Sequence, residues 1–137
     1  MTAVVQAWRA SEVKTFLAFY DGVLARLLTA AGDREAAREH LNVALKMGQD
    51  TWIQFYDAEL LRLRAHTLDD EDAQHQHFRS AIELAQQQGA HIFELRSAAD
   101  DFELIGEPAR AALLEACHRL PDDQTWPDLA RARALLE

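Results

Sequence analysis

Hydrophobic residues recur along most of this chain at intervals of three and four, the spacing of an amphipathic helix. Two such patterns follow each other closely in residues 23 to 45, VLARLLTAAGDREAAREHLNVAL. Between them, Gly32 favours the left-handed conformation that ends a helix, and Asp33 offers an oxygen to the N–H groups that begin the next one. The segment therefore predicts a helical hairpin. Its expected inward-facing residues are Leu24, Leu27, Leu28 and Ala31 on the first helix, and Ala37, Leu41, Ala44 and Leu45 on the second.

The same pattern, interrupted by single glycines and polar turns, predicts further helices along the chain. Gly48 is expected to end the second helix. Thr51 and Gln54 match the S/T-x-x-E/Q pattern of a capping box for the third. The expected elements are hairpins over 12–47, 52–87 and 91–120 and a capping helix over 126–136. No alternating strand pattern bounded by turn residues occurs, so the sequence predicts an all-α fold of about seven helices in one domain, 1–137.

Small residues recur where paired helices would cross closely. They include Ala25, Ala65 and Ala99, which lie 40 and 34 residues apart and bracket the 34-residue tetratricopeptide period. Further matches to that repeat pattern are Leu28, Ala37, Leu41 and Ala44 in the first copy, Phe78 and Ala81 in the second, and Phe102, Ala111, Leu114 and Ala116 in the third. The repeat predicts hairpins stacked as a right-handed superhelix.

Three segments carry a more specific resemblance: YDAELLRLRA (56–65), FRSAIELAQQQGAHIFELRSA (78–98) and WPDLARARALL (126–136). Together they resemble the C-terminal tetratricopeptide region of bacterial signalling proteins that join a nucleotide-cyclase or DNA-binding domain to a signal-transduction ATPase. The resemblance covers about residues 11 to 136. It implies a non-catalytic region that contacts a protein partner or its own ATPase domain. The chain has no G-x-x-x-x-G-K-[ST] phosphate loop, so the ATPase itself is not expected here.

Charge and composition argue against several classes of partner. The 137 residues contain 14 Lys and Arg against 23 Asp and Glu, a net charge of −9 that repels nucleic acids and anionic membranes. The single cysteine, Cys117, forms no internal disulfide and suits a reducing compartment. No apolar run is long enough for a membrane span or a signal peptide. We expect a cytoplasmic protein with no nucleic-acid or membrane partner.

Candidate catalytic and metal-binding residues have simpler interpretations. None of the six histidines has a histidine partner at the i, i+4 spacing of a helical metal site, and the acidic run 69–72 lacks the order of a calcium loop. Cys117 next to His118 suggests a nucleophile and a base, but neighbouring helical residues diverge and Cys117 lies in an apolar register. The sequence favours a buried structural thiol, no metal, no cofactor and no enzymatic activity. A small hydrolase is the least favoured alternative.

The first helix of each predicted hairpin would line the concave groove of a tetratricopeptide stack. Three arginines, Arg26, Arg62 and Arg96, form a potential ladder for a carboxylate or an acidic peptide. The residues expected to line the groove are Phe19, Arg26, Glu59, Arg62, His66, Phe93, Arg96, Asp100 and Glu103. The competing interpretation is structural, because Glu59–Arg62 and Arg96–Asp100 have the i, i+3 and i, i+4 spacings of pairs that brace a helix.

Two functional hypotheses follow from these patterns. The first is a protein-interaction module that regulates signalling or transcription by binding a peptide, a partner domain or its own ATPase. The second is homo-oligomerisation, for example as a homodimer, through apolar residues near the N-terminus. The residues expected in that interface are Val4, Val5, Trp8 and Phe16.

Overall fold

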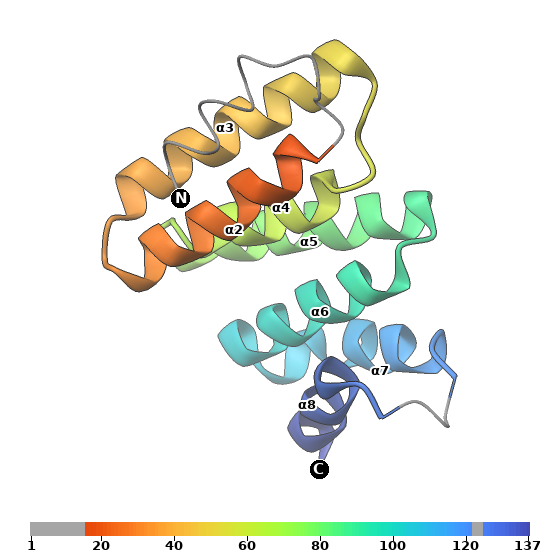
Figure 1. The fold of residues 1–137 in the computed structure, drawn as a ribbon. Coiled ribbons are helices and arrows are strands. Elements are labelled where there is room, and N and C mark those ends of the chain that lie inside the picture. The colour runs from red at the N-terminus through yellow and green to blue at the C-terminus, as the bar shows by residue number, and fades with distance from the viewer. Residues whose placement is uncertain (1–15, 122–124) are drawn as a thin grey trace. The chain divides into compact units, whose positions relative to one another are not determined.

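A computed structural model describes residues 16–121 and 125–137, and this part of the chain is all-helical (Figure 1). The described residues contain seven α-helices, one 3₁₀ turn and no strand, which confirms the predicted all-α class. The elements are α2 (Leu17–Ala30), α3 (Arg34–Thr51), α4 (Asp57–Ala65), α5 (Glu71–Gln88), α6 (His91–Ile105), η1 (Glu107–Ala109), α7 (Arg110–His118) and α8 (Pro127–Leu136). Val4, Val5 and Trp8, expected in an oligomer interface, lie outside the described residues.

The chain divides into two compact units, Met1–Asp69 and Asp70–Glu137. In the first unit, α2 packs along α3, and α4 contacts both helices. In the second unit, α6 contacts α5, α7 and α8, so it is the central helix. The division falls inside the predicted hairpin 52–87, with α4 in one unit and α5 in the other. The single domain and the right-handed superhelix stay predictions.

The α2–α3 hairpin forms as its sequence predicts. Gly32 has a φ of 86°, and the side chain of Asp33 accepts a hydrogen bond of 3.2 Å from the backbone N–H of Ala36. The core of the first unit is rich in alanine, which lets the helix backbones approach closely. Its buried members are Ala18, Ala25, Ala37, Leu41, Ala44, Leu60 and Leu63.

The inward face of α2 differs from the predicted one. Leu24 is buried, Leu28 is half-buried, and Leu27 and Ala31 are exposed, so the prediction for the last two was wrong. The buried face of α2 instead includes Ala18, Asp21 and Ala25. The repeat pattern placed Ala25 at a close helix crossing, whereas the pattern of large apolar residues did not include Ala18 or Asp21.

The end of α3 also departs from the prediction. Gly48 lies inside the helix and is buried. A Cβ atom at this position would lie only 2.8 Å from Oδ1 of Asp57. The helix continues to Thr51, whose hydroxyl donates to the carbonyl of Met47 at 2.7 Å rather than capping a new helix. Trp52, which falls at the start of the predicted hairpin 52–87, is the C-cap of α3, with a φ of 62°, and is 89% exposed. The missing side chain of Gly48 therefore allows α3 to lie close to the start of α4. Helix α3 ends four residues later than expected.

In the second unit, α5 follows its predicted pattern, and α7 follows it in part. Asp70 caps α5 by accepting a 2.7 Å hydrogen bond from the N–H of Ala73, and Gly89 ends the helix with a φ of 65°. The repeat positions Phe78 and Ala81 of α5 are buried, as are Ile82 and Ala85. On α7, the buried residues are Leu113, Ala116 and Cys117, whereas Ala111 and Leu114 are exposed.

Candidate functional site

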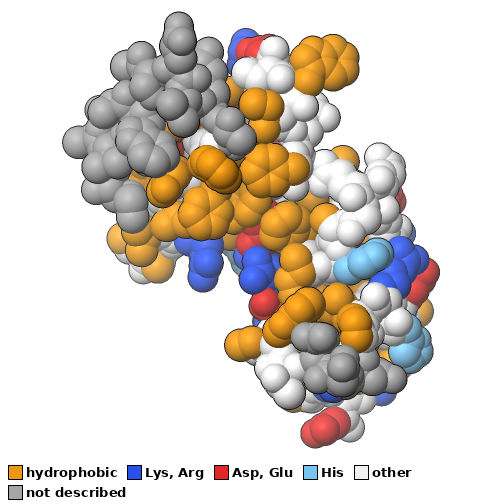
Figure 2. All heavy atoms as spheres, turned by 45° about the vertical axis from the view of Figure 1, so that its right-hand side comes forward, with side chains coloured by type: hydrophobic (Ala, Val, Ile, Leu, Met, Phe, Trp, Pro, Cys, Tyr) orange, Lys and Arg blue, Asp and Glu red, His pale blue; other side chains and the backbone are white. Residues whose placement is uncertain are grey.

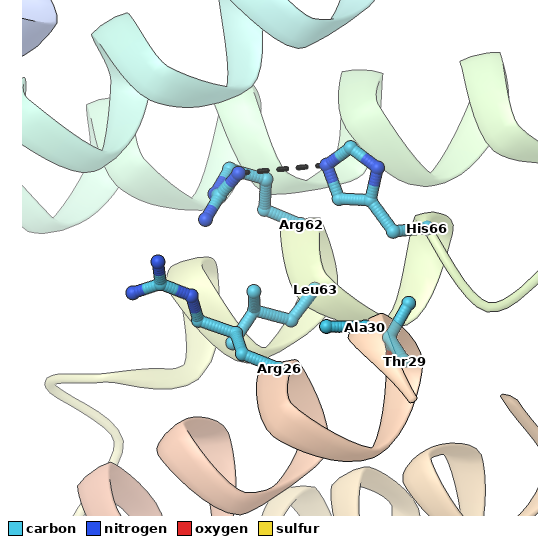
Figure 3. Close-up of a pocket in the computed structure, with 6 residues that line it drawn as sticks. All are labelled: Arg26, Thr29, Ala30, Arg62, Leu63 and His66. Carbon is cyan, nitrogen blue, oxygen red and sulfur yellow. Dashed lines mark hydrogen bonds between the residues drawn. The ribbon is translucent and has the colours of Figure 1, made fainter. Parts of the chain in front are cut away.

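A pocket of about 370 Å³ lies in the first unit between the C-terminal half of α2 and the end of α4 (Figure 3). Three of its lining residues were predicted to face a groove, and the structure brings them together from two segments far apart in the sequence. They are Arg26 from α2 and Arg62 and His66 from α4 and its C-cap. The remaining lining residues are Thr29, Ala30 and Leu63.

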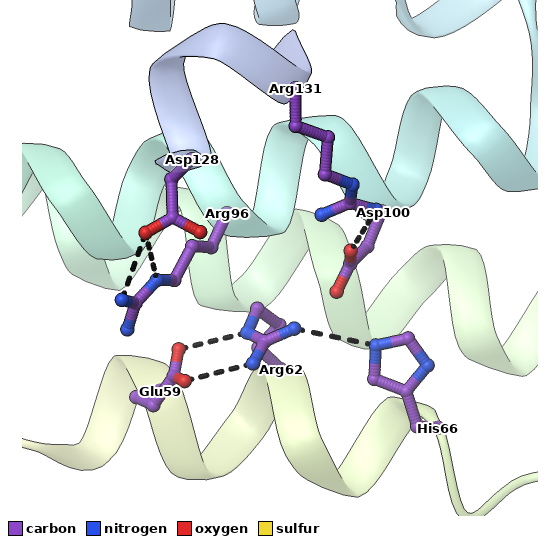
Figure 4. Close-up of polar contacts among 7 residues, drawn as sticks. All are labelled: Glu59, Arg62, His66, Arg96, Asp100, Asp128 and Arg131. Carbon is purple, nitrogen blue, oxygen red and sulfur yellow. Dashed lines mark hydrogen bonds and ion pairs between the residues drawn. The ribbon is translucent and has the colours of Figure 1, made fainter. Parts of the chain in front are cut away.

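Arg62 is held in place by a buried carboxylate. Its Nε donates to Oε2 of Glu59 and its Nη2 donates to Oε1, both at 2.8 Å (Figure 4). Nη1 lies 3.5 Å from Nε2 of His66. This is the bracing pair that the i, i+3 spacing predicted, and the bidentate geometry fixes the plane of the guanidinium group. The charge of Arg62 is therefore largely offset within its own helix.

Arg26 is in a different situation. It is exposed, and it makes no hydrogen bond or ion pair with another described residue. Its guanidinium group points to the same side of the pocket as that of Arg62 (Figure 3). Arg26 also lines a second hollow of about 350 Å³, together with Val23, Leu27 and Ala30. Its charge is available to a ligand in either position.

Exposed apolar side chains follow the outer face of α2 next to this pocket. Phe16, Phe19 and Leu27 are 56%, 43% and 53% exposed. Together with the half-buried Val23, they have the i, i+3, i+7, i+11 spacing of one helix face. The ring of Phe19 contacts that of Tyr56 edge-on, with centroids 5.6 Å apart. Figure 2 shows hydrophobic side chains gathered on the surface in this view, with Lys and Arg side chains beside them. We call Phe16, Phe19, Val23 and Leu27 the α2 stripe.

The predicted groove residues of the second unit are engaged with α8 (Figure 4). Nε and Nη2 of Arg96 donate to Oδ2 of Asp128 at 3.1 and 2.9 Å. Nη2 of Arg131 lies 2.7 Å from Oδ1 of the buried Asp100 and 2.7 Å from Oε2 of Glu103. Burial lowers the pKa of Arg131, but the hydrogen bonds to Glu103 and Asp100 outweigh it and leave the pKa above its usual value. These contacts tie α6 to α8. Phe93, the remaining predicted residue, is half-buried on α6.

Buried acidic residues are a feature that the sequence patterns did not predict. Asp21 on α2 lies 3.4 Å from Nδ1 of His40 on α3, and Asp101 on α6 lies 2.7 Å from Nδ1 of His75 on α5. Asp57 is buried at the start of α4, and this burial raises its pKa to about 6. The helical register could have indicated their burial, since each acidic residue falls among the apolar positions of its helix.

The structure places the candidate nucleophile in a core. Cys117 is buried among the apolar residues of α6, α7 and α8, whereas His118 is exposed. Burial raises the pKa of the Cys117 thiol, although the charge of Arg133 lowers it in part. A raised pKa disfavours the thiolate, which is the nucleophilic form. This environment favours a structural thiol.

Within the ranges 16–121 and 125–137, no three His, Cys, Asp or Glu side chains are grouped so that they could hold a metal ion. In the same ranges, no helix has both the length and the apolar character needed to cross a bilayer. Comparison of the chain with protein-family models, with curated proteins and with solved structures finds no match.

Proposed function

We propose that this chain is a non-catalytic interaction module that binds a segment of another protein along the α2 stripe. The observation that carries the proposal is the exposure of Phe16, Phe19 and Leu27 on one face of a helix whose opposite face is buried. Exposed apolar patches bordered by polar residues are typical of protein–protein interaction sites. The Arg26 pocket supplies such a polar border.

The biological setting of the proposal comes from the sequence resemblance. The segments 56–65, 78–98 and 126–136 support a tetratricopeptide region of a bacterial signalling ATPase, linked to a cyclase or to a transcription regulator. In that setting, the bound segment belongs to a partner protein or to the ATPase domain itself, and binding regulates the output domain in the cytoplasm.

The proposal is tested by selecting random peptides displayed on phage for binding to the purified chain. The selected peptides are then measured against a Leu27→Glu variant, which places a charge in the α2 stripe, and against a Leu114→Glu variant. Leu114 is a matched control because it is an exposed leucine of the second unit. We expect peptides that bind the wild type and the control but lose affinity at least ten-fold for Leu27→Glu. Selection of only those peptides that bind all three proteins equally would overturn the proposal.

Assembly of two copies is the second candidate, because the exposed Phe16 was expected in an oligomer interface and lies on the same stripe. Sedimentation of the wild type and the Leu27→Glu variant separates the two functions. A dimer that dissociates in the variant supports assembly through α2. A wild-type monomer at high concentration removes this candidate and leaves the peptide-binding proposal standing.

A further inference from the structure

We propose that the pocket formed by Arg26, Arg62 and His66 receives a carboxylate side chain of the segment bound along the α2 stripe. This inference rests on the proposed function and adds the chemical class of the ligand. The bound segment is then acidic and amphipathic, with apolar residues against α2 and at least one glutamate or aspartate that reaches into the pocket.

The first argument is the unmatched charge of Arg26. The chain contains 23 acidic residues and only 14 basic ones, yet Arg26 has no ion-pair partner among the described residues. It shares its pocket with a second guanidinium group, that of Arg62 (Figure 3). Arg62 already has a carboxylate partner in Glu59, so the charge of Arg26 is the one in this pocket that attracts a further anion. The pocket is therefore electrostatically complementary to an anionic group.

The second argument concerns the amount of charge and favours a carboxylate over a phosphate. Glu59 already offsets the charge of Arg62 through two 2.8 Å hydrogen bonds, so that Arg26 supplies about one net positive charge. A carboxylate carries one negative charge, whereas a phosphate monoester carries about −1.5 to −2 at pH 7. The excess charge of a phosphate would face a chain whose net charge is −9. The planar guanidinium group of Arg26 also matches the two oxygens of a carboxylate.

The third argument is the position of the pocket relative to the α2 stripe. Arg26 is next to Leu27 in the sequence and lines a hollow with Leu27 and Val23, so its charge and the apolar surface meet on the same helix. The pocket itself contains the apolar side chains of Ala30 and Leu63, which suit the methylene groups of a glutamate. A ligand that satisfies both features has an acidic residue close to a large apolar one.

The test uses NMR of the full chain labelled with ¹⁵N-arginine and follows the Nε–Hε signal of Arg26. The probes are the capped dipeptide acetyl-Leu-Glu-amide, the matched neutral dipeptide acetyl-Leu-Gln-amide, and inorganic phosphate. We expect the glutamate dipeptide to shift the Arg26 signal and to bind at least ten-fold more tightly than the other two probes. Ten-fold corresponds to about 1.4 kcal/mol.

Two charge-removing variants provide the comparison. We expect Arg26→Gln to weaken binding of the glutamate dipeptide at least ten-fold, and Arg79→Gln to leave it unchanged. Arg79 is a matched control because it is an exposed arginine of α5 whose nearest carboxylate, Glu83, lies 4.0 Å away. Equal binding of the glutamine dipeptide, tighter binding of phosphate, or an unaltered affinity in Arg26→Gln would each overturn the inference.

The first 15 residues contain one acidic residue, Glu12, and the experiment also asks whether this chain supplies the carboxylate itself. A Glu12→Gln variant tests it. Spectra of both proteins are recorded without a probe. If the Arg26 signal lies at the position of the probe-bound form in the wild type but not in Glu12→Gln, the chain fills its own pocket, and the inference is overturned.

The inference and the proposed function fail in different ways. Phage-selected peptides that depend on Leu27 but contain no acidic residue support the function and overturn the inference. A glutamate dipeptide that binds at Arg26, with no Leu27-dependent peptide, supports the anionic pocket and overturns the function.

Discussion

The ionised carboxyl group of Asp57 is expected to lower the free energy of unfolding of the first unit at neutral pH. The substitution Asp57→Asn is expected to restore it. Asp57 begins α4 and is only 6% exposed, and its Oδ1 has no hydrogen-bond partner among the described residues. Gly48 of α3 lies directly against it, since a Cβ added at Gly48 would meet Oδ1 at 2.8 Å. Desolvation of a charge without such a partner disfavours the ionised form.

The size of the effect follows from the pKa of Asp57. Burial raises that pKa from 3.8 to about 6, and each pKa unit corresponds to about 1.36 kcal/mol. The folded state therefore binds the proton more tightly than the unfolded state. The ionised carboxyl destabilises the first unit by about 3 kcal/mol above pH 6, and this cost disappears as the pH falls through 6 towards 3.8. A buried amide with an imperfect partner costs about 1 kcal/mol, so Asp57→Asn is expected to gain about 2 kcal/mol at pH 7.

Urea unfolding between pH 4 and pH 8 measures this difference. Far-UV circular dichroism follows the loss of helix, with the same readout for every variant. The control is Asp50→Asn, which neutralises an exposed aspartate of α3 and is expected to change the free energy of unfolding by less than about 0.5 kcal/mol.

The comparison of pH profiles isolates Asp57, because every other titratable group is present in both proteins. We expect the free energy gained on acidification from pH 7 to pH 4 to be about 2 kcal/mol larger in the wild type than in Asp57→Asn, because part of the cost is still present at pH 4. Parallel profiles for the two proteins would refute the reasoning, because they would show that Asp57 does not titrate abnormally in the fold.

Three further predictions use the same structure. Gly48→Ala is expected to lower the free energy of unfolding by about 1–3 kcal/mol, because the clash with Asp57 exceeds the gain in helix propensity of about 1 kcal/mol; a stabilised variant in thermal denaturation would contradict it. Arg131→Ala removes the ion pairs to Asp100 and Glu103 and is expected to cost about 1 kcal/mol in urea unfolding, since the arginine is partly exposed. An unchanged midpoint would show that these contacts add nothing. Cys117 is expected to react with a thiol reagent at least ten-fold more slowly in the native protein than in urea, because it is buried and its pKa is raised; rapid native labelling would contradict its place in the core.

Signals confined to neighbouring residues predicted much of the fold. The turn at Gly32 and Asp33, the end of α5 at Gly89 and the inward residues of α5 all appear where the sequence places them. Each of these features depends on a backbone conformation, on a cap within one turn of a helix or on the period of a single helix. A sequence carries that information directly, because the groups involved lie within a few residues of one another.

Contacts between segments far apart in the sequence decided the rest. Glycine often follows the last residue of a helix, but Gly48 lies inside α3. At this position the side chain of Asp57, nine residues later, leaves no room for a Cβ atom. Arg26 and Arg62 were expected on one groove, but only the packing of α2 against α4 shows that they share a pocket and that Glu59 offsets one of them.

The sequence by itself therefore determined that the chain is helical, where its clearest turns lie and which faces of several helices are apolar. The tertiary structure decided which charges are buried, which are paired and which face solvent. The physical reason is that helix formation depends on local backbone energetics, whereas the environment of a charge depends on every segment that packs around it.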